Sequence, residues 1–168
     1  MVESSASDIP ALARQLAAAD PLRRAEAAER LCRSGAAARP VACDLVRACG
    51  DDEPDVREWA VAALEELGPP PDGTLGDLAA LAADAHPLVA YWAVTLLGRS
   101  GKAAASAAPV LATCLGSTDT AVAQRAAWAL GKIGAAAGDA KAALETAAAS
   151  PDPRLARLAR EALDQAGQ

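Results

Sequence analysis

The sequence predicts an all-α fold, an α-solenoid of about nine helices in which one helical unit recurs at a constant interval. The composition is the first observation: apolar residues make up 52 % of the chain, aromatic residues only 2 %, and Phe is absent. Ala supplies most of the apolar content and is the strongest helix former, while strand-forming residues are scarce. The second observation is an evenly spaced column of glycines, at Gly35, Gly68, Gly101, Gly134 and Gly167. A fixed period of this length, about 33 residues, is the sequence signature of a repeat architecture.

Each of these glycines follows a predicted amphipathic helix, the first helix of its unit. Apolar residues stand twelve, eight and four positions before the glycine, for example Val56, Ala60 and Leu64 before Gly68. Steps of four place these side chains on one stripe of a helix, which must be buried against a neighbour. The column eight positions before the glycine contains only alanine: Ala27, Ala60, Ala93, Ala126 and Ala159.

The start of each first helix also has a recurring signature. The pairs that occupy this column are Asp20-Pro21, Glu53-Pro54, His86-Pro87, Asp119-Thr120 and Asp152-Pro153. An Asp side chain accepts hydrogen bonds from the first turn of a helix, and Pro suits the first helical position. Glycine tolerates the left-handed conformation that closes a helix, so each unit has its own start and stop signals.

A second helix is predicted between each glycine and the next start signal, with apolar residues about six, ten and fourteen positions after the glycine. These residues are Val41, Leu45 and Ala48 or Cys49, then Leu75, Leu78 and Leu81, then Ala107, Leu111, Cys114 and Leu115, and finally Ala140, Leu144 and Ala147. Ile9, Leu12 and Leu16 match the second helix of a truncated leading unit. In the second unit the prolines of residues 69–71 delay the start, and Thr74 with Asp77 forms a capping-box pattern that places it near Thr74.

The length of the chain predicts a single domain over residues 1–168. Stacking supports this, because one helix pair cannot bury its apolar stripe alone, whereas stacked pairs bury it between them. The domain consists of an N-terminal half repeat (1–19), four helix pairs (20–52, 53–85, 86–118 and 119–151) and a C-terminal capping helix (152–168).

The segments RAAWALGKIG (125–134) and VREWAVAALEELG (56–68) resemble the first helix of HEAT repeats, in particular the short subclass of phycobilisome lyase-like proteins. The resemblance covers residues 8–167 and implies a right-handed superhelix that binds partners on the face of its second helices. The sequence departs from the family pattern at Arg23, which replaces an aliphatic residue. Arg24 and Arg57 keep the arginine that usually follows, whereas Ala90, Ala123 and Ala156 replace it.

Charge and cysteine content exclude several classes of function. A net charge of −6 argues against a nucleic-acid-binding protein, which would usually be basic. Residues 51–84 contain ten acidic residues and one basic residue, a run that is either a set of solvated helix faces or a field that attracts a basic partner. Four cysteines without a CxxC pair, and a single histidine, do not match a zinc site, so we expect no metal or cofactor. Buried reduced thiols are typical of a cytoplasmic protein, and neither a signal peptide nor a membrane span is predicted.

Candidate partner-binding residues fall on two sets of helices. The second helices offer Asp44, Arg47, Asp77, Val110, Thr113 and Thr146, a small and mildly polar face that suits an amphipathic helix or an extended segment of another protein. The first helices offer Trp59, Trp92 and Trp128, which either fill the seam between helices or form an exposed aromatic ridge. On the closing helix, Arg154, Arg157 and Arg160 share one side and serve either as a polar cap or as a dock for an anionic partner.

No catalytic motif is visible, so the favoured hypothesis is a monomeric, non-enzymatic protein-interaction scaffold or adaptor with a basic or amphipathic protein partner. The resemblance alone suggests a bilin lyase or isomerase subunit as an alternative. A third hypothesis is a solenoid that processes nucleic acid, similar to the HEAT-like alkylpurine DNA glycosylases, although the basic cradle of those proteins is missing here.

Overall fold

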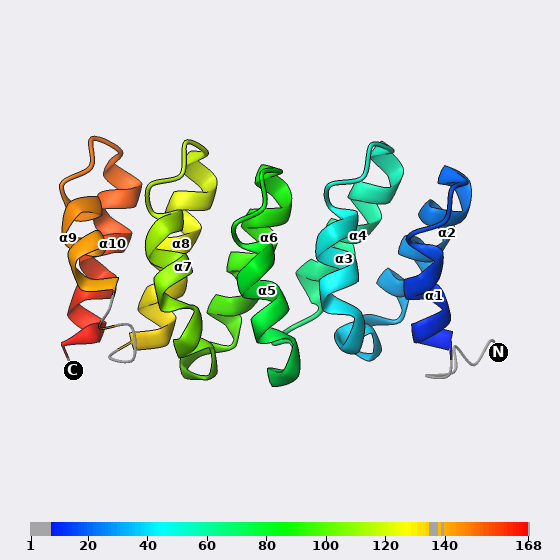
Figure 1. Cartoon of the computed structure of the whole chain (residues 1–168), viewed down its shortest axis with the longest axis horizontal. Helices are drawn as coiled ribbons and strands as arrows, with labels where there is room; N and C mark the ends of the chain where they lie inside the picture. The colour runs from blue at the N-terminus through cyan, green and yellow to red at the C-terminus, as the bar shows by residue number, and fades with distance from the viewer. Residues whose placement is uncertain (1–7, 135–137, 139, 168) are drawn as a thin grey trace. The chain divides into compact units, whose positions relative to one another are not determined.

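The computed structural model describes residues 8–134, 138 and 140–167, and its elements are helical throughout this part of the chain (Figure 1). It contains ten α-helices, against about nine expected, because a leading helix, four pairs and a closing helix make ten. The chain divides into two compact units, Met1–Thr74 and Leu75–Gln168, and the division falls directly after the proline-rich segment. The expectation of one domain over residues 1–168 stays a prediction.

The first unit consists of a leading helix, one complete helix pair and the first helix of the next pair. Its elements are α1 (Ile9–Gln15), α2 (Pro21–Arg33), the 3₁₀ segment η2 (Gly35–Val41), α3 (Ala42–Ala48), α4 (Pro54–Glu66) and the 3₁₀ segment η3 (Asp72–Thr74). The two long helices α2 and α4 pack against each other, while α1 packs on α2 and α3 on α4.

The second unit continues the same alternation. Its elements are α5 (Leu75–Leu81), α6 (Pro87–Arg99), the 3₁₀ segment η4 (Gly101–Ala107), α7 (Ala108–Cys114), α8 (Thr120–Ile133), α9 (Lys141–Ala148) and α10 (Pro153–Ala166). The first helices α6, α8 and α10 form one row, and the second helices α5, α7 and α9 each pack against one member of it. The five first helices, from α2 to α10, begin at the residues that the start signals predict.

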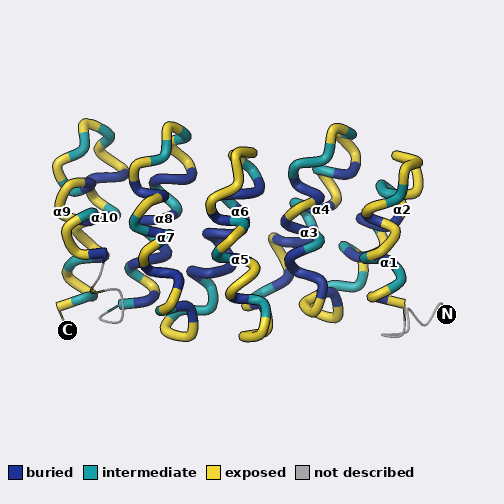
Figure 2. Tube along the Cα trace, viewed as in Figure 1, coloured by how far each residue is buried: buried dark blue, intermediate teal, exposed yellow. Residues whose placement is uncertain are grey.

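The predicted stripe is the core of both units (Figure 2). The five alanines that precede the glycines by eight positions are 0 % exposed, and Leu31, Leu64, Leu97 and Leu130 of the next column are buried with them. Alanine lets neighbouring helices approach closely, so the stability of this core comes from many small contacts rather than a few large side chains. Leu81 differs from expectation: it is half-buried, and the adjacent Ala82 takes the buried position.

The glycine column closes helices as predicted at four of its five positions. Gly35, Gly68, Gly101 and Gly134 have φ angles of 53°, 74°, 55° and 67°, a region that residues with a Cβ avoid. Gly167 is the exception, with φ −89°. In two units a 3₁₀ segment begins at the glycine and precedes the short α-helix. Pro40 and Pro109 lie near the junction between the two, and each lacks a backbone N–H donor.

Two columns of residues cap the first helices, and only one of them was predicted from the sequence. Asp20, Asp119 and Asp152 accept hydrogen bonds from the first turn as expected, whereas Glu53 and His86 make no such side-chain bond. A further column two residues upstream accepts the backbone N–H of the N-cap residue at 2.8–3.2 Å. It consists of Asp51, Asp84, Ser117 and Ser150, which keep the same spacing as the glycines. These turns orient the chain where it enters each first helix from Pro54 onward.

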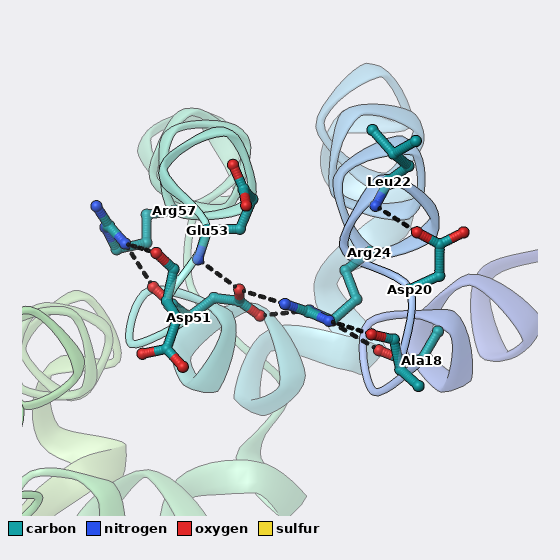
Figure 3. A network of polar contacts seen from close by, with 9 residues as sticks. Ala18, Asp20, Leu22, Arg24, Asp51, Glu53 and Arg57 are labelled. Atoms are coloured by element: carbon teal, nitrogen blue, oxygen red, sulfur yellow. Dashed lines mark hydrogen bonds and ion pairs between the residues drawn. The ribbon is translucent and has the colours of Figure 1, made fainter.

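An arginine ladder joins the repeats of the first unit (Figure 3). The Arg24 guanidinium donates two hydrogen bonds to the Asp51 carboxylate, at 2.7 and 2.9 Å, and the two side chains are only 18 % and 13 % exposed. Arg24 also donates to the carbonyls of Ala18 and Ala19, and Arg57 makes the same pair of bonds one repeat later, to the carbonyls of residues 51 and 52. Desolvation raises the pKa of Asp51, but hydrogen bonds from Arg24 and the Glu53 N–H outweigh it and hold that pKa below its usual range.

Candidate partner-binding surfaces

Two of the predicted residues, Thr113 and Thr146, lie on one groove between the second helices α7 and α9. The groove has a volume of about 680 Å³ and is walled mainly by small apolar side chains. Its lining residues are Ala112, Thr113, Leu115, Gly116, Ala143, Thr146, Ala147, Ala149, Ser150, Pro151 and Leu155. Each threonine hydroxyl donates to the carbonyl four residues earlier, Pro109 or Ala142, so its oxygen remains able to accept a hydrogen bond from a ligand. The groove is therefore apolar and contains two hydrogen-bond acceptors, the hydroxyl oxygens of Thr113 and Thr146, at equivalent positions of consecutive repeats.

The other predicted residues of the second helices do not line this groove. Val110 on α7 is half-buried, and Asp77 in the first turn of α5 is exposed. In the first unit, Asp44 and Arg47 form an ion pair across one turn of α3, with Arg47 Nη1 at 3.4 Å from Asp44 Oδ1. Both side chains are largely exposed, so the pair neutralises local charge but contributes little to stability.

The three tryptophans have different environments. Trp59 on α4 is 36 % exposed, whereas Trp92 on α6 is 6 % exposed and its Nε1 has no hydrogen-bond partner. The ring of Trp92 meets that of Tyr91 edge-on, with 5.7 Å between centroids, and the Arg99 guanidinium lies 5.7 Å from it. Trp128 on α8 is half-buried beneath Arg125, whose guanidinium carbon is 5.0 Å from the ring centroid. Only Trp59 therefore combines an aromatic side chain with substantial exposure.

A second hollow, which sequence reasoning missed, lies among the first helices α6, α8 and α10. It has a volume of about 140 Å³ and is lined by Tyr91, Ala121, Gln124, Arg125, Trp128, Arg154 and Leu158. Arg125 occupies the column that holds Trp59 and Trp92 in earlier units, nine positions before the glycine. That break in the column is the sequence signal from which the hollow could have been found.

Burial raises the pKa of three of the four cysteine thiols and so lowers their nucleophilicity. The four cysteines form no disulfide, and burial raises the pKa of Cys49 to about 12. Desolvation also raises the pKa of Cys114 and Cys32, so these thiols stay protonated at neutral pH. Across the described ranges, no group of three His, Cys, Asp or Glu side chains is placed to hold a metal ion. None of the described helices is both long and apolar enough to cross a bilayer.

Helix pairs in repeat register, with a groove between the second helices α7 and α9, define a helical repeat protein of the α-solenoid type. The sequence matches the family of HEAT repeats over residues 76–164, more than half of its length, and the chain belongs to that family. A search of curated proteins gives no significant match.

Solved structures confirm the fold. The chain is similar to an engineered protein, with TM-score 0.68 and 23 % identity over 98 % of this chain and 85 % of the other. It is similar to a designed armadillo repeat protein in complex with the peptide (KR)4, with TM-score 0.68 and 18 % identity over 95 % and 82 % of the two chains. It is also similar to the complex of CpcE and CpcF of phycocyanin lyase from Nostoc sp. PCC7120, with TM-score 0.61 and 17 % identity over 94 % and 99 %. Identities this low show the fold alone, the α-solenoid.

Proposed function

We propose that the protein is a non-enzymatic scaffold or adaptor in the cytoplasm that binds a basic, amphipathic segment of a partner protein. The observation that carries the proposal is the groove between α7 and α9. Its volume of about 680 Å³ lies in the range of sites that enclose several side chains, and its apolar walls match the apolar side of such a segment. Thr113 and Thr146 supply hydrogen-bond acceptors at equivalent places on consecutive repeats.

Charge supports a basic partner. The first unit carries fourteen acidic and eight basic residues and the second unit eight of each, so the net charge of −6 comes wholly from the first unit. A net negative charge attracts basic segments within about a Debye length, so this support comes from the first unit, whereas the charges of the groove's own unit balance. A designed repeat protein of the same fold is complexed with the basic peptide (KR)4, which supports the choice of partner chemistry. Asp77 belongs to the same unit as the groove and is the carboxylate that we propose to contact the partner's basic side chains.

The experiment uses an 18-residue fluorescent peptide of Leu and Lys at helical spacing and measures binding by anisotropy. Thr146→Trp and Thr113→Trp fill the groove without changing charge, and we expect each to weaken binding at least about tenfold. Thr118→Trp places the same ring on an exposed loop residue outside the groove and is the matched control. Equal affinity of all three variants and the unchanged protein would refute the proposal.

The alternative, a bilin lyase-type subunit, is favoured only by the likeness to the phycocyanin lyase complex. Mixing the protein with a free bilin tests it. A visible absorption band that stays with the protein through gel filtration would support the alternative and count against a pure scaffold.

A further inference from the structure

An arginine of α8 is clamped between two aromatic rings on the row of first helices. The Arg125 guanidinium carbon lies 4.8 Å from the Tyr91 ring centroid on α6 and 5.0 Å from the Trp128 centroid on its own helix. Its Nη2 donates a hydrogen bond to the Tyr91 hydroxyl. These contacts fix the guanidinium in one orientation, so little side-chain entropy remains to be lost when a ligand binds.

The clamp leaves hydrogen-bond donors unused. Arg125 has further N–H groups beyond the one given to Tyr91, and the Tyr91 hydroxyl, which accepts that bond, still has its own proton to donate. The ion pairs of the described chain involve other arginines, namely Arg23, Arg24, Arg30, Arg33, Arg47 and Arg157. In that part of the molecule, Arg125 therefore has no carboxylate partner within 4.0 Å, and neither has Arg154.

Arg154, an exposed residue of α10, brings a second positive charge to the same hollow. Asp152 is a neighbouring anion that does not line the hollow: its Oδ2 accepts a hydrogen bond at 2.6 Å from Gln124, which does line it, and its Oδ1 caps the first turn of α10. The Gln124 bond, assisted by those backbone N–H groups, holds the pKa of Asp152 below its usual value despite desolvation, so Asp152 is ionised at neutral pH. The charges of Arg125, Arg154 and Asp152 therefore sum to a net charge of +1 at and beside the hollow.

The hollow fits a small anion with one charge. A volume of about 140 Å³ corresponds to roughly four or five water molecules, enough for a carboxylate and its first methylene groups. A net charge of one balances a carboxylate, whereas a doubly charged phosphate would remain partly uncompensated. Trp128 and Leu158 line both this hollow and a neighbouring one of about 260 Å³ between α8 and α10, so a chain that inserts a carboxylate has room for an adjacent side chain.

The geometry points to a docking site for an acidic segment of a partner protein, in which one Glu or Asp side chain enters the hollow between α6, α8 and α10. Arg125 and Arg154 bind its carboxylate, and the Tyr91 hydroxyl donates a further hydrogen bond. The apolar neighbour of that residue packs on Trp128 and Leu158. This site lies on the row of first helices and takes the opposite partner charge from the groove between α7 and α9.

The test measures anisotropy of a fluorescein-labelled peptide in which Glu and Leu alternate over eight residues, with a Gln-Leu peptide as the neutral comparison. We expect the Glu-Leu peptide alone to bind. Arg154→Gln removes one exposed cation and should weaken binding about two- to fivefold. Arg125→Met keeps much of the side-chain volume between the rings and should weaken it by about tenfold or more.

Arg160→Gln is the matched control, because Arg160 lies on the same helix, is exposed and does not line the hollow. We expect it to leave the affinity of the Glu-Leu peptide nearly unchanged, and Thr146→Trp, which fills the other groove, to do the same. The inference is wrong if Arg160→Gln and Arg154→Gln weaken binding equally, or if the Gln-Leu peptide binds as well as the Glu-Leu peptide. It is also wrong if inorganic phosphate displaces the peptide at lower concentration than acetate at equal ionic strength.

Discussion

Gly98 lies inside α6, where it leaves room for the ring of Trp128. A Cβ at Gly98 would lie 2.4 Å from Trp128 Cζ3, 2.9 Å from its Cε3 and 3.0 Å from the Cα of Ala129. Carbon atoms ordinarily pack at about 3.5–4.0 Å, so the ring would have to move by about 1 Å. In an open helix interior, replacing glycine by alanine stabilises by about 1 kcal/mol. Overpacking a fixed site costs about 1–3 kcal/mol, so we expect Gly98→Ala to destabilise by about 1 kcal/mol.

Gly131 is the repeat equivalent of Gly98 and provides the control. A Cβ there would meet the end of the flexible Gln165 side chain at 3.2 Å and no aromatic ring. Gly131→Ala should therefore be neutral or stabilise by up to about 1 kcal/mol. In a Trp128→Ala background, Gly98→Ala should lose its penalty, which gives a coupling energy of about 1–3 kcal/mol between Gly98 and Trp128.

The assay is urea unfolding followed by far-ultraviolet circular dichroism, because Trp128→Ala alters fluorescence directly. The chain has two compact units, so each transition is fitted separately. The reasoning fails if Gly98→Ala stabilises the unchanged protein as much as it stabilises the Trp128→Ala protein. A displaced Trp128 ring would also disturb the Arg125 clamp, so Gly98→Ala should weaken binding of the Glu-Leu peptide.

Four further results are expected. Gly35→Ala should destabilise by about 1 kcal/mol because φ there is 53° and no neighbouring atom crowds a Cβ, whereas Gly167→Ala, at φ −89°, should cost nearly nothing in the same denaturation assay. Asp119→Ala removes the acceptor of two backbone N–H groups and should cost about 1 kcal/mol by thermal or urea unfolding. The folded pKa of Asp51 is lowered, so its contribution to stability is present above the unfolded pKa of about 3.9 and is lost as pH falls through the folded pKa; the stability gap to Asp51→Asn should therefore narrow as pH falls below about 4. A thiol reagent at neutral pH should label Cys32, the only half-buried cysteine, before the three buried ones, and mass spectrometry of peptides would reveal a different order.

The repeat made most of the fold predictable, because its signals are local and occur five times. Pro21 and its equivalents start the first helices, and the alanine and leucine columns form the core. The sequence could not predict that the second helices would shorten into a 3₁₀ segment and a short α-helix, because that outcome depends on Pro40 and Pro109 packing in context. It also missed the turns at Asp51 and Ser117, since different residue types can accept the same hydrogen bond.

The candidate sites were less predictable, because residues that occupy the same repeat position have different environments in the structure. The column nine positions before the glycine illustrates this: its members are Glu26, Trp59, Trp92, Arg125 and Leu158. Two equivalent tryptophans differ sixfold in exposure, 36 % for Trp59 against 6 % for Trp92. Counting columns located Thr113 and Thr146 in one groove, but it could not place Tyr91 against Arg125, which depends on the ring orientations of two helices.

Repeat positions that keep one residue type and repeat positions that vary have separate physical roles in this molecule. Ala93, Ala126 and Ala159 are interchangeable in position and fully buried, so every unit gains the same packing from them and none can change alone. The column nine positions before the glycine is free of that constraint: its residue type varies, and its arginine, Arg125, lines a charged hollow while α8 keeps the repeat positions of the other first helices. Giving this position the tryptophan of the two preceding units, with Arg125→Trp, should therefore leave the helical content of the protein unchanged while it abolishes binding of the Glu-Leu peptide. Loss of helical content instead would show that Arg125 holds the fold together.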